Sequence, residues 1–327
     1  MSWKVVISDC DHGSIEEEKE EFARIGAELT FVQAKTEEDL IRTCLEADGI
    51  LNQYSLMTRR VLENLPRCKV IVRYGIGVDS IDLKASTELG IIVANVPDYC
   101  VNEVADQAVA LLLTLIRKTA FFDHQVKSGQ WECRRGAPIH RIQGRTMGLV
   151  GCGKIGQAVA RRLAAFDVRV VAFDPYIKEA GEGIGLTDLD TLLKDSDFIS
   201  IHCPLNESTR HMIGEKEFRK MAKKPFLINT SRGPIVDEKA LGVALAEGLL
   251  SGAGLDVLEK EPPDPQNPLL KMKNVILSPH TSFYSEESFH ELKRRTAQGV
   301  SDVLVGKWPE SVVNRDVIGK TRAWIKG

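Results

Sequence analysis

Three side chains in the second half of the chain are of the types needed to hold a small acid and exchange a proton with it. They are Arg232, which follows an apolar run, Glu261, which precedes two prolines, and His280, which follows a Ser-Pro pair. A guanidinium binds a carboxylate through two hydrogen bonds and polarises a neighbouring carbonyl. An imidazole can exchange a proton near neutral pH, and a nearby carboxylate would stabilise its charged form.

Each of these residues also has a less specific interpretation. Taken alone, an arginine after a strand is more often part of a surface ion pair, a histidine is more often a hydrogen-bonded structural residue, and a glutamate before prolines is more often solvated. Their spacing does not prove that the three meet. All three, however, follow predicted strands, and loops at that edge of an open α/β sheet are where ligands bind.

A glycine-rich turn that precedes these residues supplies a candidate cofactor site. The apolar run 147–150 leads into a Gly-x-Gly-x-x-Gly motif at 151–156, and a helix is predicted over 154–166. The first glycine permits the tight turn, the second lets a pyrophosphate approach the backbone, and the third lets helix and strand pack closely. Amides at the positive end of the helix would face the phosphates. The residues concerned are Gly151, Gly153, Lys154, Ile155 and Gly156.

An acidic residue at the end of the next predicted strand completes the dinucleotide pattern. Asp174 would accept hydrogen bonds from both hydroxyls of the adenosine ribose and repel a 2′-phosphate, which favours NAD over NADP. The same segment nearly matches the phosphate-binding loop of NTPases. Ile155 stands where a Ser or Thr would bind Mg²⁺, which argues against that function. The remaining alternative is a purely structural glycine turn.

The elements that must position these residues alternate between short β-branched runs and amphipathic stretches. Such alternation predicts parallel sheets covered by helices. In the first half the predicted strands are 4–7, 29–32, 49–51, 70–72 and 91–94, with helices near 15–25, 37–47, 58–65 and 82–89. In the second half the predicted strands are 147–150, 168–173, 198–202, 226–229, 252–256 and 275–277, with helices at 154–166, 189–194, 215–221, 237–247 and 286–305. A long apolar helix over 102–117 joins the two series.

Composition and charge exclude several classes of function. The 327 residues are 43% hydrophobic and 27% charged, and 43 Lys+Arg against 46 Asp+Glu give a net charge of −3. This balance gives no broad attraction to nucleic acid or anionic lipid. The first residues lack the apolar region of a secretory signal, and the apolar stretch 108–116 is too short to span a bilayer. Seven scattered cysteines without a CxxC pair indicate reduced thiols in a cytoplasmic protein and argue against a metal site.

As an ordered set, the motifs resemble those of the D-isomer-specific 2-hydroxyacid dehydrogenase family over nearly the whole chain. They are Gly151–Gly156, Asp174, Asn229-Thr-Ser-Arg-Gly233, Leu255-Asp-Val257 with Glu261-Pro262, Ser278-Pro-His280, Gly75-Ile-Gly-Val-Asp79 and Asn95-Val-Pro97. The resemblance implies an α/β fold of two doubly wound parallel-sheet domains. A flavodoxin-like substrate domain would comprise residues 1–100 and 286–327, with a Rossmann NAD-binding domain of residues 101–285 inserted. It also implies a homodimer built on the NAD-binding domains and the helix 102–117.

The same resemblance implies an oxidoreductase that interconverts a D-2-hydroxy acid and its 2-oxo acid by hydride transfer with NAD. Arg232 would hold the substrate carboxylate and polarise the 2-oxo group, His280 would be the acid/base, and Glu261 would be its partner. The amides of Ile76 and Gly77 would help bind the carboxylate. The other residues expected near the cofactor are Val104, Cys203, Pro204 and Thr209, with Pro204 at the adenosine pocket, and Thr230, Ser231 and Asp256 on the nicotinamide side.

Within the family, the segments around Arg73 and Phe283 are most similar to the C-terminal-binding-protein branch, in which the matching residues face the substrate. Members of that branch act as corepressors or as bacterial enzymes, so the alternative hypothesis is an NAD(H)-sensing, corepressor-like binding protein. Tyr54 is a further candidate for the substrate pocket. Phosphoglycerate dehydrogenases carry an Arg-Ser pair where Asn52-Gln53 stands, so phosphoglycerate is not the expected substrate. The sequence does not decide the side group of the substrate. It could be a second acidic group that binds Arg73, or a bulky apolar group.

Overall fold

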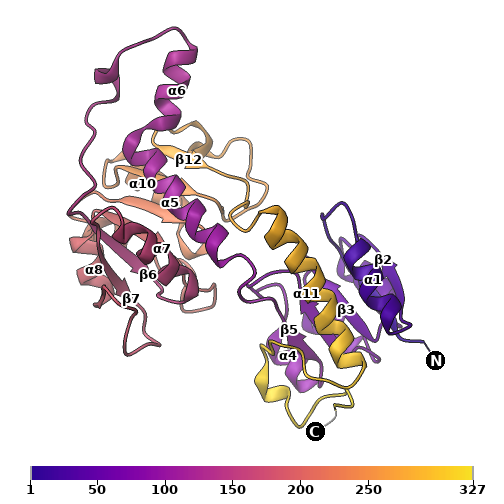
Figure 1. The fold of residues 1–327 in the computed structure, drawn as a ribbon. Helices are drawn as coiled ribbons and strands as arrows, with labels where there is room; N and C mark the ends of the chain where they lie inside the picture. Colours follow the sequence, from indigo (N-terminus) through magenta and orange to yellow (C-terminus); the bar gives the residue numbers. More distant parts are fainter. Residues whose placement is uncertain (1, 326–327) are drawn as a thin grey trace. The chain divides into compact units, whose positions relative to one another are not determined.

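The computed structural model describes residues 2–325, which divide into two compact units (Figure 1). Unit 1 comprises residues 2–99 with 285–325, and unit 2 comprises Cys100–Tyr284. Each unit contains one fully parallel sheet, with helices between most successive strands. The predicted α/β fold class is therefore confirmed. In the described chain, no helix combines the length and apolarity needed to cross a membrane.

Unit 1 has a five-stranded sheet in the order β2-β1-β3-β4-β5, which is the flavodoxin-like arrangement. Its strands are β1 (Lys4–Ile7), β2 (Glu28–Phe31), β3 (Gly49–Asn52), β4 (Val70–Arg73) and β5 (Ile92–Ala94). Its helices are α1 (Glu16–Arg24), α2 (Glu37–Cys44), α3 (Arg59–Glu63), α4 (Leu83–Glu88) and α11 (Glu286–Leu304), with a 3₁₀ turn η4 (Arg315–Val317). The helix α11 lies beside α1 and covers β3 and β4, so the end of the chain returns to the first sheet (Figure 1).

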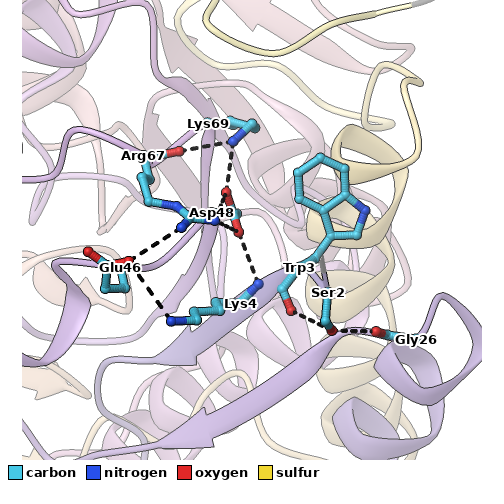
Figure 2. Close-up of polar contacts among 8 residues, drawn as sticks. All are labelled: Ser2, Trp3, Lys4, Gly26, Glu46, Asp48, Arg67 and Lys69. Atoms are coloured by element: carbon cyan, nitrogen blue, oxygen red, sulfur yellow. Dashed lines mark hydrogen bonds and ion pairs between the residues drawn. The ribbon is translucent and has the colours of Figure 1, made fainter.

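A network of charges around Asp48 ties together the amino-terminal ends of three strands of unit 1 (Figure 2). The Asp48 side chain is only 1% exposed. Its carboxylate accepts hydrogen bonds from the backbone amide of Lys4 at 3.0 Å, from Arg67 Nη2 at 3.1 Å and from Lys69 Nζ at 2.8 Å. Burial by itself raises the Asp48 pKa, but these donors outweigh it and hold the pKa below its usual value.

Unit 2 has a seven-stranded sheet in the order β12-β11-β10-β9-β6-β7-β8. Its strands are β6 (Thr146–Val150), β7 (Arg169–Phe173), β8 (Ile184–Leu186), β9 (Phe198–Ile201), β10 (Phe226–Asn229), β11 (Gly252–Leu255) and β12 (Val275–Leu277). Its helices are α5 (Val101–Arg117), α6 (Thr119–Lys127), α7 (Lys154–Ala164), α8 (Leu189–Asp195), α9 (Glu215–Lys220) and α10 (Glu238–Ala246). Three 3₁₀ turns complete the unit: η1 (Cys133–Gly136), η2 (Gly233–Ile235) and η3 (Pro268–Lys271).

The strand order of unit 2 reverses between β6 and β9, the two neighbours from which the sheet grows in opposite directions. Apolar side chains of α5 and α7 form the core on one face of the sheet, and those of α8, α9 and α10 form it on the other. In open α/β sheets a dinucleotide binds at such a reversal, outside the carboxyl ends of the strands. The glycine turn after β6 lies at that position.

Two elements of unit 2 were not predicted from the sequence. The helix α6 follows α5 directly, after Lys118 in a left-handed conformation with φ 53°. The strand β8 has only three residues, lies at the edge of the sheet and contains Gly185. The predicted strands and helices are all present, and their ends differ from the predicted ones by no more than three residues.

Candidate active site

The glycine turn between β6 and α7 has the geometry that its sequence predicts. Gly151 has φ +95°, and a Cβ on it would come within 2.7–2.9 Å of the backbone of His202 and Cys203. A Cβ on Gly156 would lie 2.6 Å from the carbonyl oxygen of Gly151. The space beside Gly153 is open, since a Cβ there would meet nothing within 4 Å. Only the middle glycine therefore leaves room for a ligand, and α7 begins at the next residue.

Asp174 follows β7 and is held beside the glycine turn. Its Oδ2 accepts a hydrogen bond from the amide of Cys152 at 2.9 Å, and its Oδ1 accepts one from the amide of Tyr176 at 3.0 Å. A carboxylate has about four acceptor positions, so these two bonds leave capacity for a ligand's hydroxyl groups. The carboxylate is thus fixed in place and can still accept further hydrogen bonds.

The loop after β9 contains three more of the predicted cofactor residues. The hydroxyl of Thr209 donates to the carbonyl oxygen of Pro204 at 2.7 Å and accepts from the amide of Asn206 at 2.8 Å. Thr209 is buried, so its hydroxyl closes this loop from within. The carbonyl oxygen of Cys203 accepts a bond from Ser231 at 2.5 Å, which joins this loop to the next. Val104, on α5, is buried as well.

The segment after β10 positions Arg232 through the amide side chain of Asn229. Asn229 donates to the carbonyl oxygen of Arg232 at 2.9 Å and accepts from the amide of Ser231 at 3.0 Å. The guanidinium of Arg232 donates to the carbonyl oxygen of Ser231 at 2.8 Å. Thr230 is 8% exposed, and its hydroxyl has no hydrogen-bond partner within residues 2–325. A buried hydroxyl left without a partner is costly, and a bound ligand would satisfy it.

Glu261 and His280 form a hydrogen-bonded pair. His280 Nδ1 lies 2.7 Å from Glu261 Oε2, and the other oxygen of Glu261 accepts from the amide of Leu258 at 3.0 Å. Because a carboxylate only accepts, Nδ1 carries the proton and Nε2 is the nitrogen left for exchange. The ring of Phe283 lies edge-on to the imidazole, with centroids 6.4 Å apart.

Several charges and hydrogen bonds act on the carboxylate of Glu261. Burial by itself raises the pKa of Glu261. The hydrogen bond from His280, its positive charge, the amide of Leu258 and the charge of Arg232 together outweigh burial and lower that pKa below its usual value. The fold thus brings the carboxylate of Glu261 and the imidazole of His280 into contact, and the charge of Arg232 acts on the same pair.

Asp256, predicted on the nicotinamide side, also organises the turn that carries His280. Its carboxylate accepts from the Ser278 hydroxyl at 2.6 Å and from the amides of Thr281 at 3.0 Å and Ser282 at 2.9 Å. Ser278 accepts in turn from Gln107 on α5 at 3.1 Å. Sequence reasoning missed Gln107, although a polar residue within the apolar stretch of a helix is a signal that could have identified it.

The remaining candidates, Tyr54, Arg73, Ile76 and Gly77, lie in unit 1. Arg73 is the last residue of β4, Tyr54 lies in the loop after β3, and Ile76 and Gly77 lie in the loop after β4. Arg73 Nε donates to the carbonyl oxygen of Gln53 at 3.3 Å. The hydroxyl of Tyr54 donates to Asp11 at 3.2 Å. The side chain of Asn95 donates to the carbonyl oxygen of Ile76 at 2.6 Å, which fixes the loop.

The residues of unit 2 fit a nicotinamide dinucleotide. The open space beside Gly153, the spare acceptor positions of Asp174 and the buried, unpartnered hydroxyl of Thr230 all lie at the carboxyl edge of one sheet. They would face a pyrophosphate, a ribose and a polar group of the cofactor, respectively. Among residues 2–325, His, Cys, Asp and Glu do not gather in threes in a way that could hold a metal ion.

Several known proteins are similar to this chain. A family model described as "D-isomer specific 2-hydroxyacid dehydrogenase, NAD binding domain" matches residues 109–282. A glyoxylate reductase of Korarchaeum cryptofilum is 41% identical over 268 residues, which are 79% of this chain and 80% of that protein. A D-3-phosphoglycerate dehydrogenase of Methanocaldococcus jannaschii is 38% identical over 308 residues, which are 91% of this chain but 58% of that protein.

Among solved structures, a glyoxylate reductase from Paecilomyes thermophila has a TM-score of 0.87 and 28% identity. The match covers 95% of this chain and 98% of that one. A family model that spans more than half of the sequence and a relative 41% identical over four fifths of it lead to the same conclusion. This chain belongs to the D-isomer-specific 2-hydroxyacid dehydrogenase family.

Proposed function

We propose that this chain interconverts a D-2-hydroxy acid and its 2-oxo acid, with Arg232, Glu261 and His280 as the residues that act on the substrate. The observation that carries the proposal is the 2.7 Å hydrogen bond between His280 Nδ1 and Glu261, within reach of the charge of Arg232. A cation for the carboxylate and a proton-exchanging nitrogen are the two groups that this reaction requires of the protein.

In the reductive direction, His280 would donate the proton on Nε2 to the 2-oxo oxygen while Glu261 holds Nδ1. When bound, the nicotinamide supplies the hydride. Arg232 would bind the substrate carboxylate, and its charge and that of the imidazolium would stabilise the negative charge that grows on the oxygen. In the oxidative direction, neutral His280 would take the hydroxyl proton at the same nitrogen.

We propose NAD rather than NADP as the cofactor. The carboxylate of Asp174 is fixed at the end of β7 by two backbone amides, and it would repel a 2′-phosphate. Pro175 and Tyr176 follow, so the segment offers no arginine to receive such a phosphate.

The substrate carboxylate would also be bound by the amides of Ile76 and Gly77. Neither amide donates to an acceptor within residues 2–325, and the loop is held in place by Asn95. Arg73, Tyr54 and Phe283 would face the rest of the substrate. Relatives named glyoxylate reductase make a small 2-oxo acid the first candidate. The phosphoglycerate dehydrogenase relative is the longer protein, and this chain has Asn52-Gln53 where the family's phosphoglycerate enzymes have Arg-Ser.

Steady-state oxidation of NADH and NADPH by the purified chain tests the function. The panel would contain glyoxylate, pyruvate, phenylpyruvate, oxaloacetate and sulfopyruvate, with chiral analysis of the product. We expect turnover of at least one acid to a D-product, or to glycolate from glyoxylate. We also expect a preference of roughly tenfold or more for NADH, equivalent to about 1.4 kcal/mol. NADH binding by calorimetry without turnover of any acid would contradict the proposal and favour a cofactor-sensing binding protein.

We further propose that the chain forms a homodimer through unit 2, as the family resemblance implies, with α6, which directly follows the predicted interface helix α5, as part of the contact surface. No side chain of this nine-residue helix is buried, and α6 stands away from the sheet of its unit (Figure 1). Isolated helices of this length are marginal in water, so α6 needs a covering surface. Val126 is 47% exposed and Trp131 88% exposed, and a second copy would bury both.

The seven cysteines, all within residues 2–325, form no disulfide, which supports a cytoplasmic location.

A further inference from the structure

A chain of three side chains connects the helix α5 to the turn that carries His280. Gln107 Nε2 donates to Ser278 Oγ at 3.1 Å, and Ser278 Oγ donates to Asp256 Oδ1 at 2.6 Å. Gln107 is half-buried, and Asp256 is 2% exposed. The three residues come from α5, from the end of β12 and from the end of β11, all within unit 2.

The direction of these hydrogen bonds follows from their chemistry. The carboxylate of Asp256 only accepts, so the single hydroxyl proton of Ser278 is committed to it. The oxygen of Ser278 is then an acceptor, and only the NH₂ end of Gln107 can face it. A carboxylate in place of Gln107 would have the same shape and no proton to donate. The amide is therefore required for its chemistry as well as for its size.

Asp256 is the centre around which the turn 278–282 folds. Besides Ser278, its side chain accepts from the amides of Thr281 and Ser282, and its backbone carbonyl accepts from the amide of His280 at 2.8 Å. His280 has φ +52°, a left-handed conformation that a residue with a Cβ rarely adopts. Such a conformation persists only where the surroundings hold it. The bonds to Asp256 are what hold it here.

We propose that Gln107 is a positioning residue for His280, acting through Ser278 and Asp256. Gln107 orients the Ser278 hydroxyl, and this hydroxyl fixes the Asp256 carboxylate. The carboxylate fixes the backbone of the turn, which directs the imidazole of His280 toward Glu261. The inference rests on the proposed function in so far as His280 is the acid/base. The contacts themselves do not depend on that role.

Kinetics of matched variants test this relay. In Gln107→Leu and Gln107→Glu we expect kcat to fall roughly 10- to 100-fold at pH 8, because small displacements of a catalytic group are costly, while the KM for NADH changes less than about twofold. The pH at which reduction declines should also move, which loss of stability alone would not cause. Gln298→Leu, which removes a local bond to Asp302 on α11, is the control and should match the unchanged chain.

The double variant shows whether Gln107 acts through Ser278. If it does, Gln107→Leu combined with Ser278→Ala should be no slower than Ser278→Ala alone, since the second change removes a link that is already broken. Effects that multiply would overturn the relay. Full activity of Gln107→Glu would overturn the requirement for a donor.

Hydrogen exchange of the turn provides a readout that needs neither cofactor nor turnover. We expect the amides of residues 280–282 to exchange about tenfold faster in Gln107→Leu than in Gln298→Leu. Unchanged exchange with reduced kcat would overturn the inference, because the effect would not pass through the turn. Faster exchange in a chain that reduces no 2-oxo acid would uphold the positioning role and refute only the proposed function.

Discussion

At the scale of single residues, the site depends on which nitrogen of the His280 ring is hydrogen-bonded to Glu261. Glu261 holds Nδ1 at 2.7 Å, so the exchangeable proton belongs to Nε2. The pKa of Glu261 is lowered from its ordinary 4.5, so this carboxylate stays charged through the neutral range and can stabilise the imidazolium. In the proposed mechanism Glu261 matters as much as His280, because it would set both the orientation of the ring and the nitrogen that reacts.

Replacing Arg232 by lysine tests whether the guanidinium anchors the substrate. Arg232→Lys keeps the positive charge but loses the pair of parallel donors that matches a carboxylate. We expect kcat/KM for the preferred 2-oxo acid to fall about 10- to 100-fold, the usual cost of a charged hydrogen bond. NADH binding, followed by fluorescence titration, should not change. An unaltered kcat/KM would show that another residue binds the carboxylate.

Site residues can be predicted from the sequence where the residue type itself indicates the chemistry and stands in a short motif. The glycines, Asp174, Arg232, Glu261 and His280 all stand in short motifs that the sequence displays. The hydrogen bond of Gln107 to Ser278 spans 171 residues and has no motif of its own. Such long-range polar contacts depend on how α5 packs on the sheet, which hydrophobic patterning alone does not specify.

At the scale of elements, the carboxyl ends of parallel strands determine where the chemistry collects. Arg232 follows β10, Asp256 follows β11 and His280 follows β12, three neighbouring strands of one sheet. Strand positions could be predicted because buried parallel strands are continuous apolar runs. The strand β8 could not, since a three-residue edge strand with a glycine has no such run. The helix α6 was missed because it buries no face.

The charge network at the amino-terminal edge of unit 1 predicts a pH-dependent contribution to stability. Asp48→Asn leaves the charges of Arg67 and Lys69 without a buried partner, and we expect the free energy of unfolding at pH 7 to fall by about 3 kcal/mol. The folded Asp48 pKa is depressed, so its contribution is present above the ordinary value of 3.8 and is lost as pH falls through the lower folded value. Urea unfolding of both proteins at pH 7 and near pH 3 measures this.

Glu88→Gln is the control for the Asp48 experiment. Glu88 pairs with Arg59 at 2.8 Å on the surface of the same unit, where both side chains are more than 40% exposed. Exposed pairs contribute less than about 1 kcal/mol. A loss for Asp48→Asn as small as that for Glu88→Gln, or one that grows as the pH falls, would refute the stabilising role of the buried network.

At the scale of the whole molecule, each unit has its own sheet and core, and the exposed helix α6 is the element through which we propose that a second copy binds. Val126→Glu combined with Trp131→Glu should convert a dimer into a monomer, because two charges would enter an apolar interface. Light scattering after size exclusion should give twice the chain mass for the unchanged protein and the single mass for the variant. Ile318→Glu, at an exposed apolar residue of unit 1, is the matched control. An identical mass in solution for the unchanged protein and the double variant would contradict this interface.

The acid/base role of His280 is tested most directly by comparing kcat for NADH-dependent reduction of the preferred 2-oxo acid between the unchanged chain and His280→Asn. We expect kcat to decrease roughly 10²- to 10⁴-fold, with NADH affinity retained, because Nε2 of His280 is the proposed proton donor. A variant that turns over at a rate close to that of the unchanged chain would contradict it.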